Sequence, residues 1–426
     1  MTHPPSPQPS GSRPDAEGAR SSANCPANPA RPRVAIKPRR AQPLFGRHPW
    51  VFAGAVHSVQ PPAEPGDEVD VVSDRGEWIA RGLFNPHSGI RVRLYRWSAS
   101  DSLNDEFLHH RLAQAVDFRR QTPGLWGPDT ACRLVFSEGD ALSGLVVDRY
   151  GDWLLLQCTS LALYLRLPKL VESLIALVQP KGIWLRTEKG IREAEGLETA
   201  DRLIWGEPPP RPLKLVEHGV TYEVDVVEGQ KTGFFLDQRD NRLELARFAR
   251  PGRLLDVCCY SGGFALNAAR LPQITGVVAL DVSARALELA ASNARLNQVE
   301  SRIEFRKGDA FDTLTKLNAS GEKFANVVLD PPKLARHAAG LDEALRGYHG
   351  LNRLALQLIE PGGLLVTCSC TGHVTRPLFE QTVAKAAASA GRHVEVLANR
   401  GAAPDHPVSI HCPESDYLKA LFCRVL

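Results

Sequence analysis

The sequence has no run of roughly 18 or more apolar residues, the length that a helix needs to cross a bilayer. We therefore expect no membrane-embedded segment. The sequence also lacks a CxxC pair, although it contains nine cysteines, so neither a disulfide framework nor a zinc site is indicated and we expect no bound metal. No apolar segment follows the start of the chain, as a secretory signal would require, which favours a cytoplasmic protein with reduced thiols.

Acidic residues are absent from Gly18 to Ala63, where every charged side chain is basic. The formal net charge of +3 is too small to indicate nucleic-acid binding by itself. The basic segment is therefore either a solvated tail and loop or a surface that faces phosphate groups. Residues 1–33 contain hardly any large apolar side chain, and we expect them to form a disordered tail.

Residues 34–103 are expected to fold as a small β-barrel, because short apolar runs alternate there with turn residues. In the strand expected at Ile90 to Trp97, the side chains of Arg91, Arg93 and Tyr95 share one face. A face of cations and an aromatic ring suits a nucleic acid, but any half-buried strand shows the same alternation.

Residues 104–218 are expected to form a linker helix, at 104–122, followed by a small α+β domain. We find no catalytic constellation in this region. Its expected elements are strands at Cys132 to Phe136, Leu142 to Val147, Trp153 to Cys158 and Ile183 to Thr187, and a helix at Leu161 to Val178.

Residues 219–426 show strands and helices in alternation, which predicts an α/β domain with a Rossmann-like parallel sheet covered on both faces. The expected strands are 254–257, 277–280, 325–329, 364–367 and 418–426, and the expected helices are 264–271, 283–296, 341–359 and 376–390. Ligands bind such sheets outside the carboxyl ends of the strands, so the residues after each strand are the ones to examine.

The first strand end carries Asp256 and, six residues later, Gly262 and Gly263. Two glycines before a helix allow the backbone to approach a ligand, although a tight turn without a ligand would also explain them. The second strand ends in Asp281, which could accept both hydroxyls of a ribose or could cap the following helix. Asp309, at a third strand end, could accept a hydrogen bond from an adenine amino group or be an ordinary turn residue.

The fourth strand ends in Asp330, followed by two prolines that fix the loop and by Lys333. With the other strand-end acids and the glycines, this DPPK segment resembles class I methyltransferases, and the resemblance implies S-adenosylmethionine as the cofactor. A hydride-transferring Rossmann enzyme would more usually carry an intact GxGxxG fingerprint, which is absent here.

The fifth strand runs into Cys370, on the same sheet edge as Asp330. Cytosine C5 is too weak a nucleophile to accept a methyl group directly, so an enzyme can first add a thiolate to C6. Cys370 is the candidate nucleophile, and Asp330 is the candidate acid at N3 or a ligand of the N3/N4 edge. Cys258, Cys259 and Cys368 are expected to be buried structural residues.

Six motifs together are similar to those of the bacterial large-subunit (23S) ribosomal RNA cytosine-5 methyltransferases that carry an N-terminal PUA domain. They are FGRHPWVF at 45–52, KTGFFLDQR at 231–239, CCYSGGF at 258–264, DPPK at 330–333, SCTG at 369–372 and DHP at 405–407. The resemblance covers nearly the whole chain after the tail. It implies a PUA domain, a central α+β domain and a catalytic domain, with Cys370 at the nucleophile position.

The resemblance implies two sets of contacts, although the segment 231–239 could instead be a structured linker with an N-cap at Asp237. We expect the cofactor at Asp256, Tyr260, Ser261, Gly262, Gly263, Asp281, Asp309 and Asp330. We expect the RNA, as 23S rRNA or a large-subunit precursor, at Gln238, Arg239, Lys333, Arg47, Arg91 and Arg93. A homodimer is compatible with the sequence.

One departure from the pattern is Lys333, which stands where other RNA cytosine-5 methyltransferases carry a second cysteine that assists enzyme release. The base that removes the C5 proton is therefore unassigned. Two other functions stay open. Methylation of an exocyclic base nitrogen would usually show an aromatic residue at this place, and a noncatalytic RNA-binding assembly factor would need none of the strand-end acids.

Overall fold

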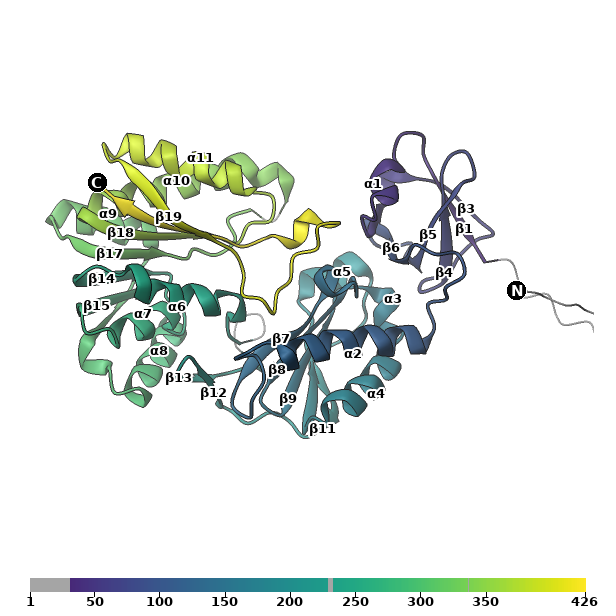
Figure 1. The fold of residues 1–426 in the computed structure, drawn as a ribbon, viewed down its shortest axis with the longest axis horizontal. Helices are drawn as coiled ribbons and strands as arrows, with labels where there is room; N and C mark the ends of the chain where they lie inside the picture. The colour runs from purple at the N-terminus through teal and green to yellow at the C-terminus, as the bar shows by residue number, and fades with distance from the viewer. Residues whose placement is uncertain (1–30, 229–232, 336) are drawn as a thin grey trace, which may run out of the picture. The chain divides into compact units, whose positions relative to one another are not determined.

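The computed structural model describes residues 31–228, 233–335 and 337–426 (Figure 1). Nearly all of the expected tail 1–33 lies outside the described residues, and so do Lys231 and Thr232 of the motif 231–239. Pro32 to Leu426 form one compact unit by their contacts.

The N-terminal part contains a six-stranded sheet in the order β2-β6-β5-β4-β1-β3 and a short helix, α1, at Gln42–Phe45. Its core is formed by buried aliphatic side chains such as Val34, Val71 and Leu94. The expected small β-barrel region thus has its own apolar core. The strands are β1 Arg33–Ile36, β2 Trp50–Phe52, β3 Val56–Gln60, β4 Glu68–Val72, β5 Trp78–Phe84 and β6 Ile90–Arg96.

The face of β6 that was expected to carry Arg91, Arg93 and Tyr95 is largely buried. Arg93 is only 7% exposed and donates hydrogen bonds to Ser143 Oγ at 3.1 Å and Glu195 Oε1 at 3.3 Å. Tyr95 is 2% exposed and donates to the main-chain oxygen of Ser143 at 2.6 Å. The prediction that Arg93 contacts RNA is therefore wrong, because its guanidinium is held by side chains of the central part of the chain. Arg91 is partly exposed.

The central part contains a helix, α2, at Asp105–Gln121 and a five-stranded sheet in the order β11-β10-β9-β8-β7. The single helix expected at Leu161 to Val178 is two helices, α3 Leu161–Tyr164 and α4 Leu167–Val178, since Pro168 starts a new first turn. A short helix, α5, follows at Lys189–Glu195. The strands are β7 Ala131–Phe136, β8 Leu145–Tyr150, β9 Trp153–Cys158, β10 Gly182–Leu185 and β11 Arg202–Gly206.

The C-terminal part contains a seven-stranded sheet in the order β16-β15-β14-β17-β18-β20-β19. The first five strands in this order are parallel, and β20 is antiparallel to both of its neighbours. A hairpin of β12 Leu213–Glu217 and β13 Val220–Val224 precedes it. The strands are β14 Gly252–Val257, β15 Ile274–Asp281, β16 Ile303–Lys307, β17 Phe324–Leu329, β18 Ile359–Ser369, β19 Val394–Arg400 and β20 Lys419–Val425.

Helices cover both faces of this sheet (Figure 1). Consecutive side chains of a strand point to opposite faces of the sheet, and both are apolar here: Leu254 packs with the helices of one face and Leu255 with those of the other. One face carries α6 Arg239–Phe248, α7 Gly263–Ala269 and α8 Ala284–Leu296, and the other carries α9 Ala310–Ser320, α10 Leu341–Leu358 and α11 Arg376–Ser389.

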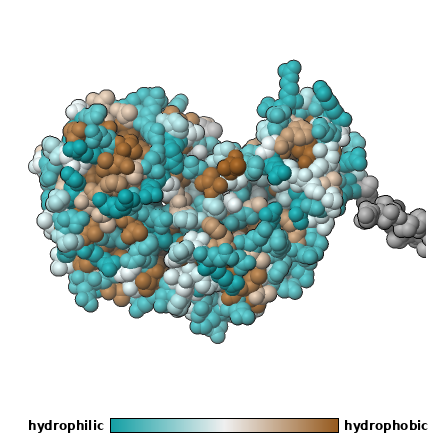
Figure 2. All heavy atoms as spheres, in the orientation of Figure 1, coloured by the Kyte–Doolittle hydropathy of each residue, from teal (hydrophilic) through white to brown (hydrophobic). Residues whose placement is uncertain are grey.

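The surface drawn in Figure 2 is mostly hydrophilic, with hydrophobic side chains in small separate groups. Within the described ranges, no helix is both long and apolar enough to cross a membrane.

Candidate active site

The loop between β14 and α7 takes an unusual backbone path. Cys258, Tyr260 and Gly262 all have positive φ, at 66°, 48° and 84°. The main-chain N–H of Tyr260 donates to Asp281 Oδ2 at 2.9 Å, and so the loop is tied to the end of β15. Only glycine adopts such angles without strain, which explains Gly262, the N-cap residue before α7. The loop thereby presents backbone groups at the carboxyl edge of the sheet.

Asp256 supports this loop from below. It is fully buried, and its Oδ2 accepts a hydrogen bond from the N–H of Ala265 at 2.9 Å. Burial raises the pKa of Asp256 to about 8. The side chain holds the start of α7 and does not reach the pocket above the loop, which corrects the prediction of a direct cofactor contact.

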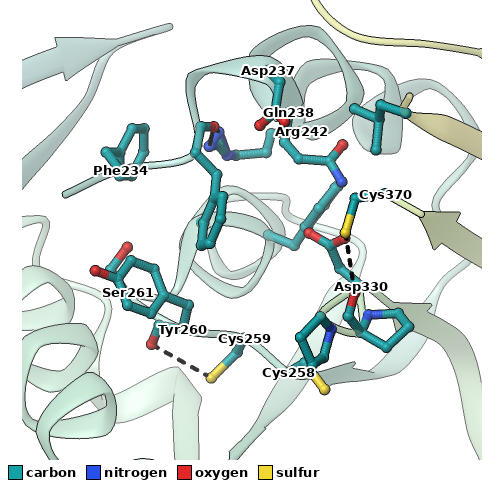
Figure 3. A pocket seen from close by; sticks show the side chains of 16 residues that line it. Phe234, Asp237, Gln238, Arg242, Cys258, Cys259, Tyr260, Ser261, Asp330 and Cys370 are labelled. Atoms are coloured by element: carbon teal, nitrogen blue, oxygen red, sulfur yellow. Dashed lines mark hydrogen bonds between the residues drawn. The ribbon is translucent and has the colours of Figure 1, made fainter. Parts of the chain in front are cut away.

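A pocket lies directly above the loop (Figure 3), and Figure 3 shows Cys370 and Asp330 on one side of it and Tyr260 on the other. The rings of Phe235 and Tyr260 meet edge to face in its wall, with centroids 5.1 Å apart. Apolar side chains and exposed backbone together suit a ligand with polar and hydrophobic parts. The lining includes five predicted site residues besides Asp330, namely Tyr260, Ser261, Gly263, Gln238 and Cys370.

Cys370 and Asp330 meet because β17 and β18 are parallel neighbours, with Leu329 in register with Thr367. The Cys370 Sγ lies 3.9 Å from the main-chain oxygen of Pro331. Both site side chains are only partly exposed. The structure therefore brings together the two side chains that were expected to do the chemistry.

Lys419, which was not expected at the site, supports the loop that carries Cys370. Its Nζ is buried and donates to the main-chain oxygens of Thr371 at 2.9 Å and Tyr417 at 2.7 Å. Burial lowers the pKa of this ammonium to about 8. The only sequence signal was a single cation at the start of the apolar last strand.

Asp281 and Asp309 lie at strand ends but do not line the pocket with Cys370. Asp281 Oδ1 accepts from the N–H of Ser283 at 2.9 Å, and Ser283 itself caps α8. Asp309 caps α9, because its Oδ1 accepts from the N–H of Asp312 at 3.1 Å. Each carboxylate oxygen has a second lone pair, so both residues keep the capacity to bind a ligand at this edge.

A second pocket also has Cys370 in its lining. Its catalytic-domain lining includes Lys333, Asp237, His406 and Tyr417. Four further lining residues come from the central part of the chain, which was expected to carry no chemistry: Arg133, Val146, Gln157 and Glu188. Cys370 thus faces two pockets, one over the loop after β14 and one that reaches the five-stranded sheet.

Arg239 does not reach either pocket. It is 4% exposed, and its guanidinium contacts Asp405 Oδ2 at 3.0 Å and Glu217 Oε2 at 3.7 Å. The prediction that it contacts RNA is wrong, since both buried carboxylates hold it inside. The alternative N-cap at Asp237 is also wrong, because α6 begins after Gln238 and the Asp237 carboxylate accepts from the Tyr417 hydroxyl.

The other predicted residues divide by exposure. Lys333 and Arg47 are exposed, which suits contacts to phosphate. Cys368 is fully buried, as expected of a structural cysteine. Cys258 and Cys259 line the first pocket, but burial raises the pKa of both thiols, so neither is activated as a nucleophile.

One group of possible metal ligands exists in the described residues, formed by His48, Cys412 and Glu414, whose donor atoms lie within 4.8 Å of one another. The Nδ1 of His48 accepts from the N–H of Trp50 at 3.3 Å. The proton of a neutral ring is then on Nε2, which donates to Glu414 Oε2 at 3.2 Å. Hydrogen bonds therefore account for this arrangement.

The parallel sheet has helices on both faces, and its strand ends carry a glycine turn, an acid and an Asp-Pro-Pro loop beside the pocket. This combination is that of a class I S-adenosylmethionine-dependent methyltransferase. Two family models agree: a PUA-like domain matches residues 34–97, and an S-adenosylmethionine-dependent methyltransferase matches residues 194–423. The predicted fold class and the predicted cofactor are confirmed.

Curated relatives give the family. Ribosomal RNA large subunit methyltransferase I from Cronobacter sakazakii is 39% identical over 395 residues, which cover 92% of this chain and 99% of that protein. The enzyme of the same name from Escherichia coli O157:H7 has the same identity and coverage, and that from Klebsiella pneumoniae is 38% identical over 396 residues. The chain belongs to the family of the large-subunit ribosomal RNA methyltransferases I.

Solved structures share the fold over the same length. The crystal structure of SMU.776, assigned as a methyltransferase and complexed with S-adenosylhomocysteine, has a TM-score of 0.80 and 20% identity over 92% of this chain and 99% of that one. A protein from Streptococcus mutans assigned to the same class has a TM-score of 0.78 and 19% identity with the same coverage.

Proposed function

We propose that this chain methylates C5 of a cytosine in large-subunit (23S) ribosomal RNA through a covalent bond between Cys370 and C6. The presence of Cys370 in the linings of two pockets carries the proposal. A thiol that adds to C6 must reach the base, and C5 of the same base must lie within reach of the cofactor's methyl group, so two pockets that share Cys370 suit the reaction. The names of the curated relatives and the PUA-like match support ribosomal RNA as the substrate, acted on in the cytoplasm.

The first pocket fits the cofactor. Its floor is the backbone of the loop after β14, and its wall contains the Phe235 and Tyr260 rings. Asp281, which fixes the N–H of Tyr260, stands where a ribose would meet the end of β15. S-adenosylmethionine, when bound, supplies a methyl group that a carbanion-like carbon can attack.

The second pocket fits the target base. Cytosine turned out of an RNA stack needs an enclosed, partly apolar site with polar groups for its edge. Phe235 and Val146 provide apolar surface there, and Gln157 and Lys333 provide polar groups. Cys370, which both pockets share, adds to C6, and Asp330 of the first pocket is the acid that protonates N3 or binds its edge, so that C5 becomes nucleophilic.

Labelled S-adenosylmethionine and undermodified large-subunit RNA test the proposal. We expect 5-methylcytidine with the wild type and none with Cys370→Ala. Cys423→Ala is the matched control, because Cys423 is a buried cysteine of β20 in the same sheet. We expect it to retain activity.

Three other results would contradict the proposal. Label on an exocyclic base nitrogen would indicate a different methyltransferase in which Cys370 is structural. RNA binding without methyl transfer would indicate a noncatalytic assembly factor. Full activity of Cys370→Ala would remove the covalent mechanism.

A further inference from the structure

Asp405 and His406 form an oriented pair at the second pocket. His406 Nδ1 lies 2.9 Å from Asp405 Oδ1, and both side chains are almost fully buried. Asp405 Oδ2 accepts from the N–H of Arg133 at 2.9 Å and from Arg239 Nη1 at 3.0 Å. Burial alone would raise the pKa of Asp405, but its contacts with His406, Arg239 and the N–H of Arg133 outweigh burial and hold the pKa below its usual range. Asp405 is therefore a fixed carboxylate.

A carboxylate at Nδ1 determines which nitrogen of a neutral imidazole carries the lone pair. Nδ1 is the donor to Asp405, so Nε2 is the acceptor. In the part of the chain that the structure describes, Nδ1 is the only ring nitrogen of His406 with a hydrogen-bond partner. The ring is fixed further by Phe136, with ring centroids 5.2 Å apart. His406 lines the pocket that Cys370 also lines.

We propose that His406, oriented by Asp405, is the base that removes the C5 proton, an inference that rests on the proposed function. After methyl transfer, C5 carries both the new methyl group and its original hydrogen. His406 Nε2 takes that hydrogen as a proton, the electrons of the C5–H bond form the C5=C6 double bond, and the C6–S bond breaks. Cys370 leaves as a thiolate, and the imidazolium later returns its proton to water.

The other polar residues of this pocket suit the step less well. The Tyr417 hydroxyl donates to Asp237, and burial raises the pKa of Tyr417 well above its usual value, so it stays protonated. Glu188 is exposed at the start of α5, where water solvates its carboxylate. Asp237 already accepts from Tyr417, and it is the main competitor.

The test uses the full-length protein and His406→Asn, whose amide nitrogen can replace Nδ1 as the donor to Asp405 but offers no base at the Nε2 position. His406→Gln is the second variant, and binding of S-adenosylhomocysteine shows which of the two is folded. His411→Asn is the matched control, because His411 is exposed on the same segment. Each protein is mixed with ordinary large-subunit RNA and with RNA containing 5-fluorocytidine, which has no C5 proton to lose.

We expect His406→Asn to accumulate a denaturation-stable RNA adduct that carries the labelled methyl group, and to release 5-methylcytidine at least about 100-fold more slowly than the wild type. With fluorinated RNA, the variant and the wild type should trap equal amounts of adduct, because addition and methyl transfer precede proton removal. His411→Asn should behave as the wild type with both RNAs.

Three results would overturn the inference: release near the wild-type rate, failure of the folded variant to trap fluorinated RNA, or adduct accumulation with Asp237→Asn in place of His406→Asn. Failure of the proposed function looks different. The wild type itself would then trap no fluorinated RNA and form no 5-methylcytidine, and both proposals would fall together.

Discussion

The Nζ of Lys419 donates a 2.9 Å hydrogen bond to the main-chain oxygen of Thr371, the residue that follows Cys370. A second hydrogen bond from the same ammonium reaches the main-chain oxygen of Tyr417, whose side chain lines the second pocket. One buried cation therefore fixes both the loop that carries the nucleophile and the backbone of a second residue that lines the same pocket. The Thr371 oxygen also accepts from the N–H of Val374 at 3.1 Å.

Replacement of this cation should destabilise the protein. Lys419→Met leaves the main-chain oxygen of Tyr417 without the Nζ donor and leaves that of Thr371 with only the N–H of Val374, at 3.1 Å, and we expect the free energy of unfolding to fall by about 2 kcal/mol. Lys333→Met is the control, since Lys333 is exposed and a change there should stay within about 0.5 kcal/mol. Denaturant titrations measure both. Equal stability of Lys419→Met and the wild type would show that water satisfies these carbonyls.

The raised pKa of Asp256 predicts a pH dependence of stability. Its carboxyl has a pKa of about 8 in the folded chain, because of burial, against about 3.9 in an unfolded chain. Between these values the folded state holds one more proton, so its contribution to stability is complete below about pH 4 and is lost as the pH rises to 8. Asp256→Asn, which cannot titrate, should remove this loss.

The comparison is made on unfolding free energies at several pH values between 5 and 8. The wild type should lose up to about 1.4 kcal/mol per pH unit more than Asp256→Asn. Parallel curves for the two proteins would mean that Asp256 is ionised in the folded chain and that another group satisfies its buried Oδ1.

Gly262 should tolerate no side chain. Its φ of 84° lies in the left-handed region, and a Cβ there would stand 3.3 Å from the Cβ of Ala290. We expect Gly262→Ala to cost about 1–2 kcal/mol of stability and to weaken S-adenosylhomocysteine binding, measured by calorimetry. Gly276→Ala is the control, because nothing lies within 4 Å of its Cβ position. If Gly262→Ala bound S-adenosylhomocysteine with wild-type affinity, the turn at Gly262 would not be part of the cofactor site.

Two arginines from the predicted RNA-binding set should behave in opposite ways. Arg239→Met removes one cation from the buried carboxylates of Asp405 and Glu217, which keep His406 and Arg242 as partners, and should cost about 3 kcal/mol of stability. Arg47→Met should leave stability unchanged, because Arg47 is exposed. If Arg47 contacts a phosphate, RNA binding should weaken and its dependence on salt should become less steep. Unchanged RNA affinity of Arg47→Met at several salt concentrations would exclude that contact.

The positions of the parallel strands in the catalytic part could be predicted from the sequence, because their short aliphatic runs stand out from the polar segments between them. It was not sufficient for β19, an edge strand in which Val396 and Leu397 are exposed, so that no alternation marks a buried face. Cys370 and Asp330 could be paired in advance, because neighbouring parallel strands bring their carboxyl ends to one edge.

Contacts across long sequence separations were beyond such reasoning. Arg93 donates a hydrogen bond to Glu195, at a sequence separation of 102 residues, and Arg239 donates one to Asp405, at a separation of 166 residues. An arginine in a strand or at a helix start has the same local pattern whether it faces RNA or a buried carboxylate. Only the fold distinguishes the two, and it does so here for both residues.

The Asp405 contacts have a consequence for recombination between members of the family. Arg119 of α2 donates to the main-chain oxygen of Asp405, Arg133 of β7 donates to its side chain, and Arg239 of α6 does the same. In a chimera that exchanges the central part alone, the incoming segment would need an arginine at the position of Arg119 and the same backbone path at that of Arg133. We therefore expect residues 105–206 and the catalytic part to be inherited as one block, and the hydrogen bonds from Arg93 to Ser143 and Glu195 extend this coupling to the N-terminal part.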